Sequence, residues 1–193
     1  MVVDSDLDLM LRVRQGDVSS FDELLRRYRA PLVKYFYRLV RDQALAEDLA
    51  QEAFLRVYNA RRRYRPDARF TTWLYRIATN LALNAIRDAR GRQRQDISNS
   101  VDDGETSFEF VDTRASVEQE MIETDRGRMI REAIESLPEN QRAAVILHKY
   151  QDVDYRQIAK VLKVSESAVK SLLFRAYETL RVRLEPLVRE GLL

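Results

Sequence analysis

The sequence predicts an all-α protein made of two small helical domains joined by an acidic, flexible linker, with a helix-turn-helix in the C-terminal domain. Apolar residues recur at three-four spacing through both halves of the 193-residue chain, and no strand-like alternation of useful length occurs. Only five Gly and four Pro are present, which disfavours a turn-rich β sandwich or barrel. The charge is uneven along the chain. Residues 1–95 carry 19 basic and 12 acidic side chains, residues 96–125 carry one basic and ten acidic side chains, and residues 126–193 carry 13 basic and nine acidic side chains.

Two basic blocks on either side of an acidic one indicate two modules and a spacer. We place an N-terminal helical domain at 1–95, an acidic linker at 96–124 and a C-terminal domain at 125–193. The linker has neither a helical nor a strand period, and we expect it to be mobile, at least in the protein alone. Of the 33 basic residues, 28 are Arg, whose planar guanidinium suits phosphates and guanine edges. Codon bias on solvated faces explains this excess equally well.

The composition excludes several classes of protein. Cys is absent and His148 is the only His, so disulfides, zinc–thiolate sites, cysteine nucleophiles and multi-histidine metal sites are excluded, and we expect no metal and no cofactor. No run of about 18 apolar residues occurs, so we expect no direct membrane insertion. The acidic start, MVVDSDLDLM, does not resemble a secretory signal, and we expect a cytoplasmic protein.

The first two helices are indicated by their start and stop residues. Ser5 can cap a short helix that Gly16 ends. The capping box at 20–23 opens a second helix. Pro31 should break or kink this helix, because its ring removes an N–H and clashes one turn back, and the apolar stripe then continues to Val40.

Two further helices complete the N-terminal domain. Residues 44–60 carry an apolar stripe, with acidic and amide side chains on other faces. Thr71 or Thr72 can cap a long helix that reaches about Arg92.

Residues 61–94 are the most basic stretch, with ten Arg against two Asp. Four rings interleave with these arginines: Tyr64, Phe70, Trp73 and Tyr75. Arg neutralises phosphates and aromatic rings stack on unpaired bases, so the combination is typical of a groove for single-stranded nucleic acid. A place in the core is an equal alternative for each ring alone, although Pro66 and the flanking charges put the loop 64–70 at the surface.

The C-terminal domain begins with two helices of ordinary pattern. Thr124 or Asp125 can cap the first, and Pro138 stands where the second can begin. Both carry apolar residues at helical spacing.

The next two helices have the spacing of a DNA-binding helix-turn-helix. Asp154 and Ser165 are suitable caps for a short helix and for a final one that runs to about Pro186. Ala159 falls where the two helices approach most closely, and Lys163 takes the turn position where Gly is usual. A left-handed Lys163 would cost about 1 kcal/mol. The same spacing also occurs in plain helical bundles, which stays the alternative.

The final helix divides into two faces. Its outward residues are Ser167, Lys170, Ser171, Phe174 and Arg175, and its inward residues are Val169, Leu173, Ala176 and Leu180. The second helix of such a pair enters the major groove and contacts bases with its N-terminal half. Lys170 and Arg175 can reach guanine edges or phosphates, and Phe174 can meet a thymine methyl group.

Four segments carry a resemblance to a known family: FDELLRRY (21–28), DLAQEAFLRVY (48–58), FTTWLYRIATN (70–80), and the block from SLPENQRAAVILHKYQDVDYRQIAKVL (136–162) into VSESAVKSLLFRA (164–176). On these, the chain resembles the bacterial extracytoplasmic-function (ECF) sigma factors, the two-domain promoter-specificity subunits of RNA polymerase. The resemblance implies an N-terminal domain that binds and melts the minus-10 element and a C-terminal domain that binds the minus-35 element as duplex. The implied partners are core RNA polymerase, promoter DNA, both duplex and melted non-template strand, and an anti-sigma factor.

The resemblance also implies roles for individual positions. The implied contact with the polymerase clamp consists of Asp48, Leu49, Gln51, Glu52, Phe54 and Leu55. The implied minus-10 and single-strand contacts, including a pocket for a flipped base in the loop 64–70, are Tyr64, Arg65, Asp67, Arg69, Phe70, Thr72, Trp73, Tyr75, Arg76 and Asn80. The minus-35 positions lie on the outward face of the final helix. Leu172 and Tyr177 stand where relatives often carry Arg, so fewer phosphate contacts are expected.

Two other classes of function remain as alternatives. A stand-alone helix-turn-helix regulator would have a ligand-sensing N-terminal domain with a pocket in residues 1–95. An enzyme with a nucleophile–His–acid site would have to use His148, whose neighbours belong to a helix. No Gly-rich loop that could cradle a phosphate occurs.

Overall fold

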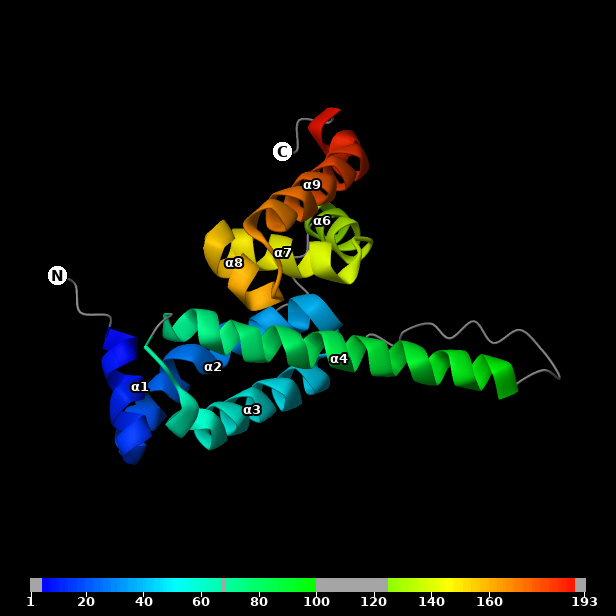
Figure 1. The fold of residues 1–193 in the computed structure, drawn as a ribbon. Coiled ribbons are helices and arrows are strands. Elements are labelled where there is room, and N and C mark those ends of the chain that lie inside the picture. Colours follow the sequence, from blue (N-terminus) through cyan, green and yellow to red (C-terminus); the bar gives the residue numbers. More distant parts are fainter. Residues whose placement is uncertain (1–4, 67–68, 100–124, 190–193) are drawn as a thin grey trace.

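The structure, a computed structural model, describes residues 5–66, 69–99 and 125–189. Throughout these ranges the regular elements are helical, which confirms the all-α prediction (Figure 1). They are α1 (Ser5–Gln15), α2 (Val18–Val40), α3 (Gln43–Ala60), the 3-10 turn η1 (Arg61–Arg63), α4 (Phe70–Asn99), α6 (Asp125–Glu135), α7 (Glu139–Tyr150), α8 (Tyr155–Leu162) and α9 (Glu166–Arg189). None of the helices in the described ranges combines the length and apolar character needed to cross a membrane.

Helices α1 to α4 form the N-terminal module, in which α2 packs against α1, α3 and α4. Its core consists of the inward faces of these helices, with the side chains of Leu24, Phe36 and Leu74 fully buried. Helix α2 begins two residues before the predicted capping box, because Asp17 rather than Ser20 is its N-cap. The Ser20 hydroxyl (2.7 Å) and backbone N–H (3.2 Å) both donate to the Asp17 carboxylate. These bonds and one from Ser19 hold the pKa of Asp17 at about 2.

Pro31 does not end α2, which runs as one helix to Val40. Leu24, before the proline, and Leu32 and Tyr35, after it, are all buried in the same core. Packing on both sides therefore holds the helix together across the missing N–H.

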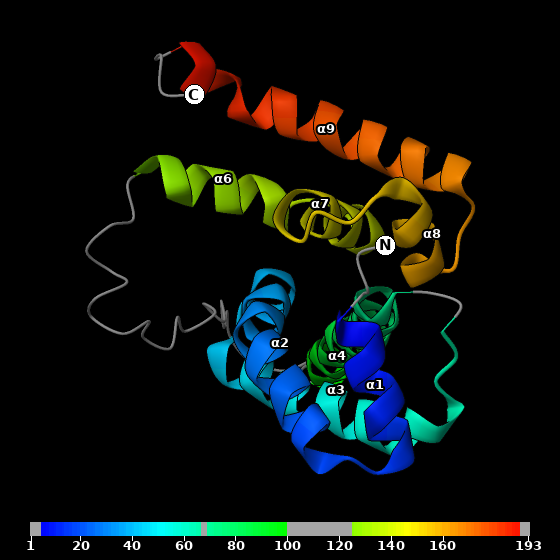
Figure 2. The same cartoon turned by 90° about the vertical axis from the view of Figure 1, so that its left-hand side faces the viewer.

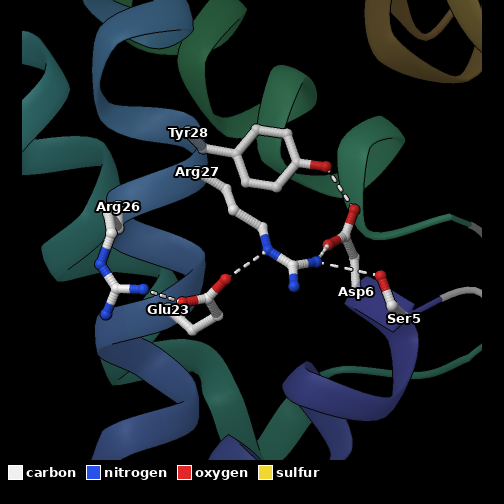
Figure 3. A network of polar contacts seen from close by, with 6 residues as sticks. All are labelled: Ser5, Asp6, Glu23, Arg26, Arg27 and Tyr28. Carbon is white, nitrogen blue, oxygen red and sulfur yellow. Dashed lines mark hydrogen bonds and ion pairs between the residues drawn. The ribbon is translucent and has the colours of Figure 1, made fainter.

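A polar network ties α1 to α2 at the end of the module (Figure 3). Arg27 donates to Asp6 (2.8 Å) and to the Ser5 hydroxyl (3.0 Å), and its Nε donates to Glu23 (2.8 Å). The Tyr28 hydroxyl donates to the other Asp6 oxygen. The Arg27 guanidinium lowers the pKa of Glu23.

Helix α4 is longer than the sequence predicts. It continues to Asn99, so residues 96–99, which we placed in the linker, are helical. The remainder of the predicted linker, 100–124, lies outside the described residues.

The C-terminal module contains the predicted helix-turn-helix. Asp154 caps α8 by accepting from the Gln157 N–H (2.8 Å), and the Ser165 hydroxyl accepts from the Ala168 N–H (3.1 Å) at the start of α9. Lys163 has the left-handed conformation, with φ 56° and ψ 45°, at the turn between the helices. The caps and the turn are therefore as predicted.

The two modules lie against each other. Figures 1 and 2 both show α8 above α4, with α7 beside it, and α4 contacts α8 while α2 contacts α7. Buried apolar residues of both modules belong to one continuous core cluster. The sequence left this arrangement open.

Candidate nucleic-acid interface

The outward face of α9 is exposed as predicted. Its five residues, Ser167, Lys170, Ser171, Phe174 and Arg175, are all solvent-accessible. The last four line one open, shallow hollow, from which the Phe174 ring projects 67% exposed. Val169, Leu173 and Ala176 on the opposite side are buried, and Leu180 is half-buried. A basic face with a projecting ring, on the second helix of a helix-turn-helix, fits the major groove of duplex DNA.

The first turns of α4 hold an aromatic cluster at the other candidate surface. The Trp73 ring lies 5.0 Å from the Tyr64 ring and 6.4 Å from the Phe70 ring, between ring centres, and Tyr28 of α2 packs against Phe70 at 5.4 Å. Tyr64 and Phe70 are buried, whereas Trp73 is half-buried. Of the predicted rings Tyr64, Phe70 and Trp73, Trp73 is therefore the most accessible to solvent.

The remaining predicted single-strand residues divide by exposure. The exposed residues are Arg65, Arg69, Arg76 and Asn80. Thr72 and Tyr75 are buried, so direct contact by them requires a change in their surroundings. Asp67 lies outside the described residues. Arg65, Arg69 and Arg76 form no ion pair with another residue that the structure describes.

Tyr75 is held between the two modules. Its ring lies 5.1 Å from that of Tyr35, and its hydroxyl donates to Gln151 in the turn after α7. Thr79, one helical turn on, donates to the Tyr75 carbonyl (2.6 Å) and is hydrogen-bonded to the Tyr35 hydroxyl (2.6 Å). Burial raises the pKa of Tyr75 to about 12, because the phenolate would lose its hydration.

Only some of the six residues predicted to bind the polymerase lie on the exposed surface of α3. Asp48, Gln51 and Leu55 are exposed, and Leu55 is an apolar side chain that is 59% exposed. Glu52 is partly exposed and accepts from Arg56 (2.7 Å). Leu49 and Phe54 are buried in the module core, so in this structure they support the helix and do not form its outer surface.

The residues that join the modules are not among those predicted from the sequence. Arg142 of α7 is buried, and its Nη1 donates to the Leu39 carbonyl (3.3 Å) of α2. Arg41 pairs with Glu135, and Arg90 pairs with Glu139. An Arg directly before the apolar run AAVIL was the available signal, since a charged residue beside a buried stripe points to a contact there.

His148 makes structural contacts. Its Nδ1 is hydrogen-bonded to the Tyr177 hydroxyl (2.9 Å), and its ring lies 5.1 Å from that of Tyr155. These contacts tie α7 to both helices of the helix-turn-helix. Within the described ranges, no cluster of three or more potential metal ligands occurs.

A helix-turn-helix on one module, and a basic, aromatic helix on the other, define a two-module DNA-binding protein. Residues 24–92 match the family model of sigma-70 region 2, and residues 127–180 match that of sigma-70 region 4. The chain is 36% identical over 191 residues to the RNA polymerase sigma-H factor of Pseudomonas aeruginosa, covering 97% of this chain and 98% of that protein. It is 34% identical over 189 residues to the ECF RNA polymerase sigma-E factor of Escherichia coli K12, and the match covers 96% of this chain and 97% of that protein. The chain therefore belongs to the ECF sigma factors, which are transcription initiation factors that bind core RNA polymerase and promoter DNA.

Solved structures share the fold at lower identity. The structure of CnrH in complex with the cytosolic domain of CnrY matches with a TM-score of 0.70 and 19% identity, over 94% of this chain and 98% of that one. The sigma factor RpoE of Bartonella quintana, in complex with the anti-sigma factor NepR, matches with a TM-score of 0.64 and 22% identity. This match covers 86% of this chain and 96% of that one.

Proposed function

We propose that the two modules of this sigma factor divide promoter recognition between two states of DNA. The α9 face of the C-terminal module binds the minus-35 element as duplex, through Lys170, Ser171, Phe174 and Arg175 with Ser167 at its edge. The start of α4 in the N-terminal module binds the unwound minus-10 strand. The observation that carries this division is the difference between the surfaces, because α9 presents a polar, basic face with one ring while α4 presents arginines around an aromatic cluster.

Roles for the single-strand residues follow from their exposure. Arg65, Arg69 and Arg76 neutralise phosphates, Asn80 contacts the strand farther along α4, and Trp73 stacks on a base. Tyr64 and Phe70 shape the wall of the pocket for a flipped base, since both pack against Trp73.

The contact with core polymerase is assigned to α3. Asp48, Gln51, Glu52 and Leu55 form a surface with two carboxylates, of which that of Glu52 is paired with Arg56, and one exposed leucine, on a module of net positive charge. A negative surface is repelled by DNA and suits a basic protein partner.

The protein has no catalytic chemistry of its own in this proposal and acts in the cytoplasm, where the polymerase synthesises RNA. The match of both modules to sigma-70 regions does not favour a stand-alone regulator. We further infer control by an anti-sigma factor, supported by the two solved relatives, whose structures are complexes named for CnrY and for the anti-sigma factor NepR.

Transcription from a pool of genomic fragments tests the proposal. Purified chain is added to core polymerase, and the 5′ ends of the transcripts are sequenced. We expect the transcription start sites to lie downstream of a shared pair of promoter elements. We also expect Arg175→Ala to relax the sequence preference at one base of the upstream element. Transcripts that are the same with and without the chain would reject the proposal.

A further inference from the structure

The aromatic cluster at the start of α4 includes a ring of α2 that is not among the predicted binding residues. The centre of the Tyr28 ring lies 5.4 Å from that of Phe70, in an edge-to-face arrangement. Phe70 in turn lies 6.4 Å from Trp73, and Trp73 lies 5.0 Å from Tyr64. Rings from three segments of the N-terminal module therefore form one continuous series of contacts.

A hydrogen bond to α1 holds the outer end of Tyr28 (Figure 3). The Tyr28 hydroxyl donates to one oxygen of the Asp6 carboxylate, and Arg27 donates to the other oxygen (2.8 Å). The Asp6 side chain is only 17% exposed, and Arg27 is itself held by Glu23 (2.8 Å). Hydrogen bonds to a carboxylate are roughly twice as strong as those between neutral groups. The Asp6 carboxylate therefore restricts the rotation of the Tyr28 side chain.

Helix α1 contacts both segments that frame the loop 64–70. It packs against η1, which ends directly before Tyr64, and against α4, which begins at Phe70. Tyr64 and Phe70 are themselves buried, so the shape of a base pocket in this loop depends on what supports these rings from inside the module. Tyr28 is such a support for Phe70, and Asp6 connects it to α1.

We propose that Tyr28 and Asp6 are positioning residues for the pocket that takes the flipped base of the minus-10 strand. The inference rests on the proposed function, because it takes the loop 64–70 and Trp73 to be the base-binding elements. The Asp6 carboxylate orients Tyr28, the Tyr28 ring holds Phe70, and Phe70 supports Trp73 where its ring stacks on the base. A pocket whose rings are already fixed binds a base more tightly, because less side-chain motion is lost on binding.

Conservative variants of the full chain, each assembled with core polymerase, separate the hydroxyl from the ring. Tyr28→Phe removes the hydrogen bond and keeps the ring, Asp6→Asn removes the charge of the acceptor, and Tyr28→Leu removes the ring. The matched controls are Tyr37→Phe, which removes the hydroxyl of another half-buried tyrosine of α2, and Asp8→Asn, which removes an exposed carboxylate of α1. Neither control residue belongs to the aromatic cluster.

The probe is a single-stranded oligonucleotide that carries the mapped minus-10 sequence, either intact or with an abasic site at one position. With the native chain, the abasic site that weakens binding most marks the flipped base. On the intact strand, the Kd of the holoenzyme should rise by about twofold to tenfold in Tyr28→Phe and Asp6→Asn, and further in Tyr28→Leu. On the strand that lacks this base, native and variant chains should bind equally, which a general loss of folding would not produce.

The contrary results are distinct from a failure of the proposed function. Tyr28→Phe and Asp6→Asn that bind the intact strand as tightly as the native chain would overturn the inference. So would an equal loss on the intact and abasic strands, or a loss of the same size in Tyr37→Phe and Asp8→Asn. In these cases the native chain still responds to the missing base, and the proposed function stands. If no abasic site weakens binding by the native chain, the base pocket of the proposed function has failed as well.

Discussion

Substitutions at two adjacent residues of α9, Leu173 and Phe174, can distinguish an effect on folding from an effect on DNA binding. Phe174 is 67% exposed, whereas Leu173 beside it is 1% exposed. Leu173→Ala should lower the free energy of unfolding by about 2–5 kcal/mol, because it leaves a cavity in the C-terminal module. Phe174→Ala should change that free energy by no more than about 0.5 kcal/mol, because the ring contacts little in the free protein.

The same ring should matter once the module is on DNA. Burying a whole Phe side chain contributes about 1.5–3 kcal/mol, and covering the exposed two-thirds of this ring therefore contributes about 1–2 kcal/mol. The Kd of the holoenzyme for a duplex minus-35 probe should rise by about fivefold to thirtyfold in Phe174→Ala.

Two measurements check this pair of variants. Thermal unfolding followed by circular dichroism reports stability, and fluorescence anisotropy with a labelled duplex reports affinity. Replacing thymine by uracil in the duplex should remove most of the difference between native chain and Phe174→Ala, if the ring contacts a thymine methyl group. Phe174 would not be a DNA-contacting residue of this kind if Phe174→Ala unfolded as easily as Leu173→Ala, or if it bound duplex as tightly as the native chain.

Four other outcomes are expected. Arg175→Ala should weaken duplex binding by about 1–3 kcal/mol and relax preference at one base in a selection from random duplexes; uniform weakening would make Arg175 a phosphate contact. Trp73→Ala should reduce open-complex formation on closed templates, measured by permanganate reactivity, more than on premelted ones, and an equal loss on both would remove the stacking role. Lys163→Gly should raise the free energy of unfolding by up to about 1 kcal/mol in denaturant titration, because φ 56° is strained for Lys, and a decrease would show that the turn is not strained. Burial raises the pKa of Tyr75 from 10 to about 12, so the stability that its buried, protonated hydroxyl contributes to the folded chain is complete below about pH 10 and is lost as the pH rises through about 12. The difference in phenolate absorbance between the native chain and Tyr75→Phe should show that late titration, and a difference that appears near pH 10 would contradict it.

Local signals in the sequence were sufficient to predict the helix-turn-helix. Asp154 and Ser165 bond to backbone N–H groups three residues ahead, and this short-range geometry is visible from residue type alone. Lys163 shows the same point, because the spacing of the apolar residues fixed the turn even without a glycine.

Competition between neighbouring signals caused the local errors. Asp17 and Ser20 are both good caps three residues apart, and the structure uses the carboxylate as cap with the serine as its donor. The sequence allows either a break or a kink at Pro31, and α2 does not break there, because tertiary packing outweighs the local preference. The resemblance implies that Leu49 and Phe54 contact the polymerase, whereas the structure buries both side chains in the module core, and their apolar character fits either place.

The contacts between the modules could not be predicted from the sequence, for a different physical reason. Arg90 and Glu139 are 49 positions apart, and Arg142 and Leu39 are 103 apart. No periodicity relates residues at such separations, and an exposed arginine has the same local pattern whether it meets a carboxylate, a ring or a phosphate. The sequence could therefore suggest strand-binding residues, but it could not show that Tyr75 is buried and hydrogen-bonded to Gln151 of the other module.

Site-specific photocrosslinking in the assembled holoenzyme tests the division of labour between the modules most directly. A photoreactive amino acid is placed at Arg76 of α4 or at Phe174 of α9, and the holoenzyme is bound to a promoter with a defined unpaired bubble. We predict crosslinks from position 76 to the unpaired non-template strand and from position 174 to paired bases upstream. Crosslinks from position 76 to paired DNA alone, or from position 174 to the bubble, would contradict the account.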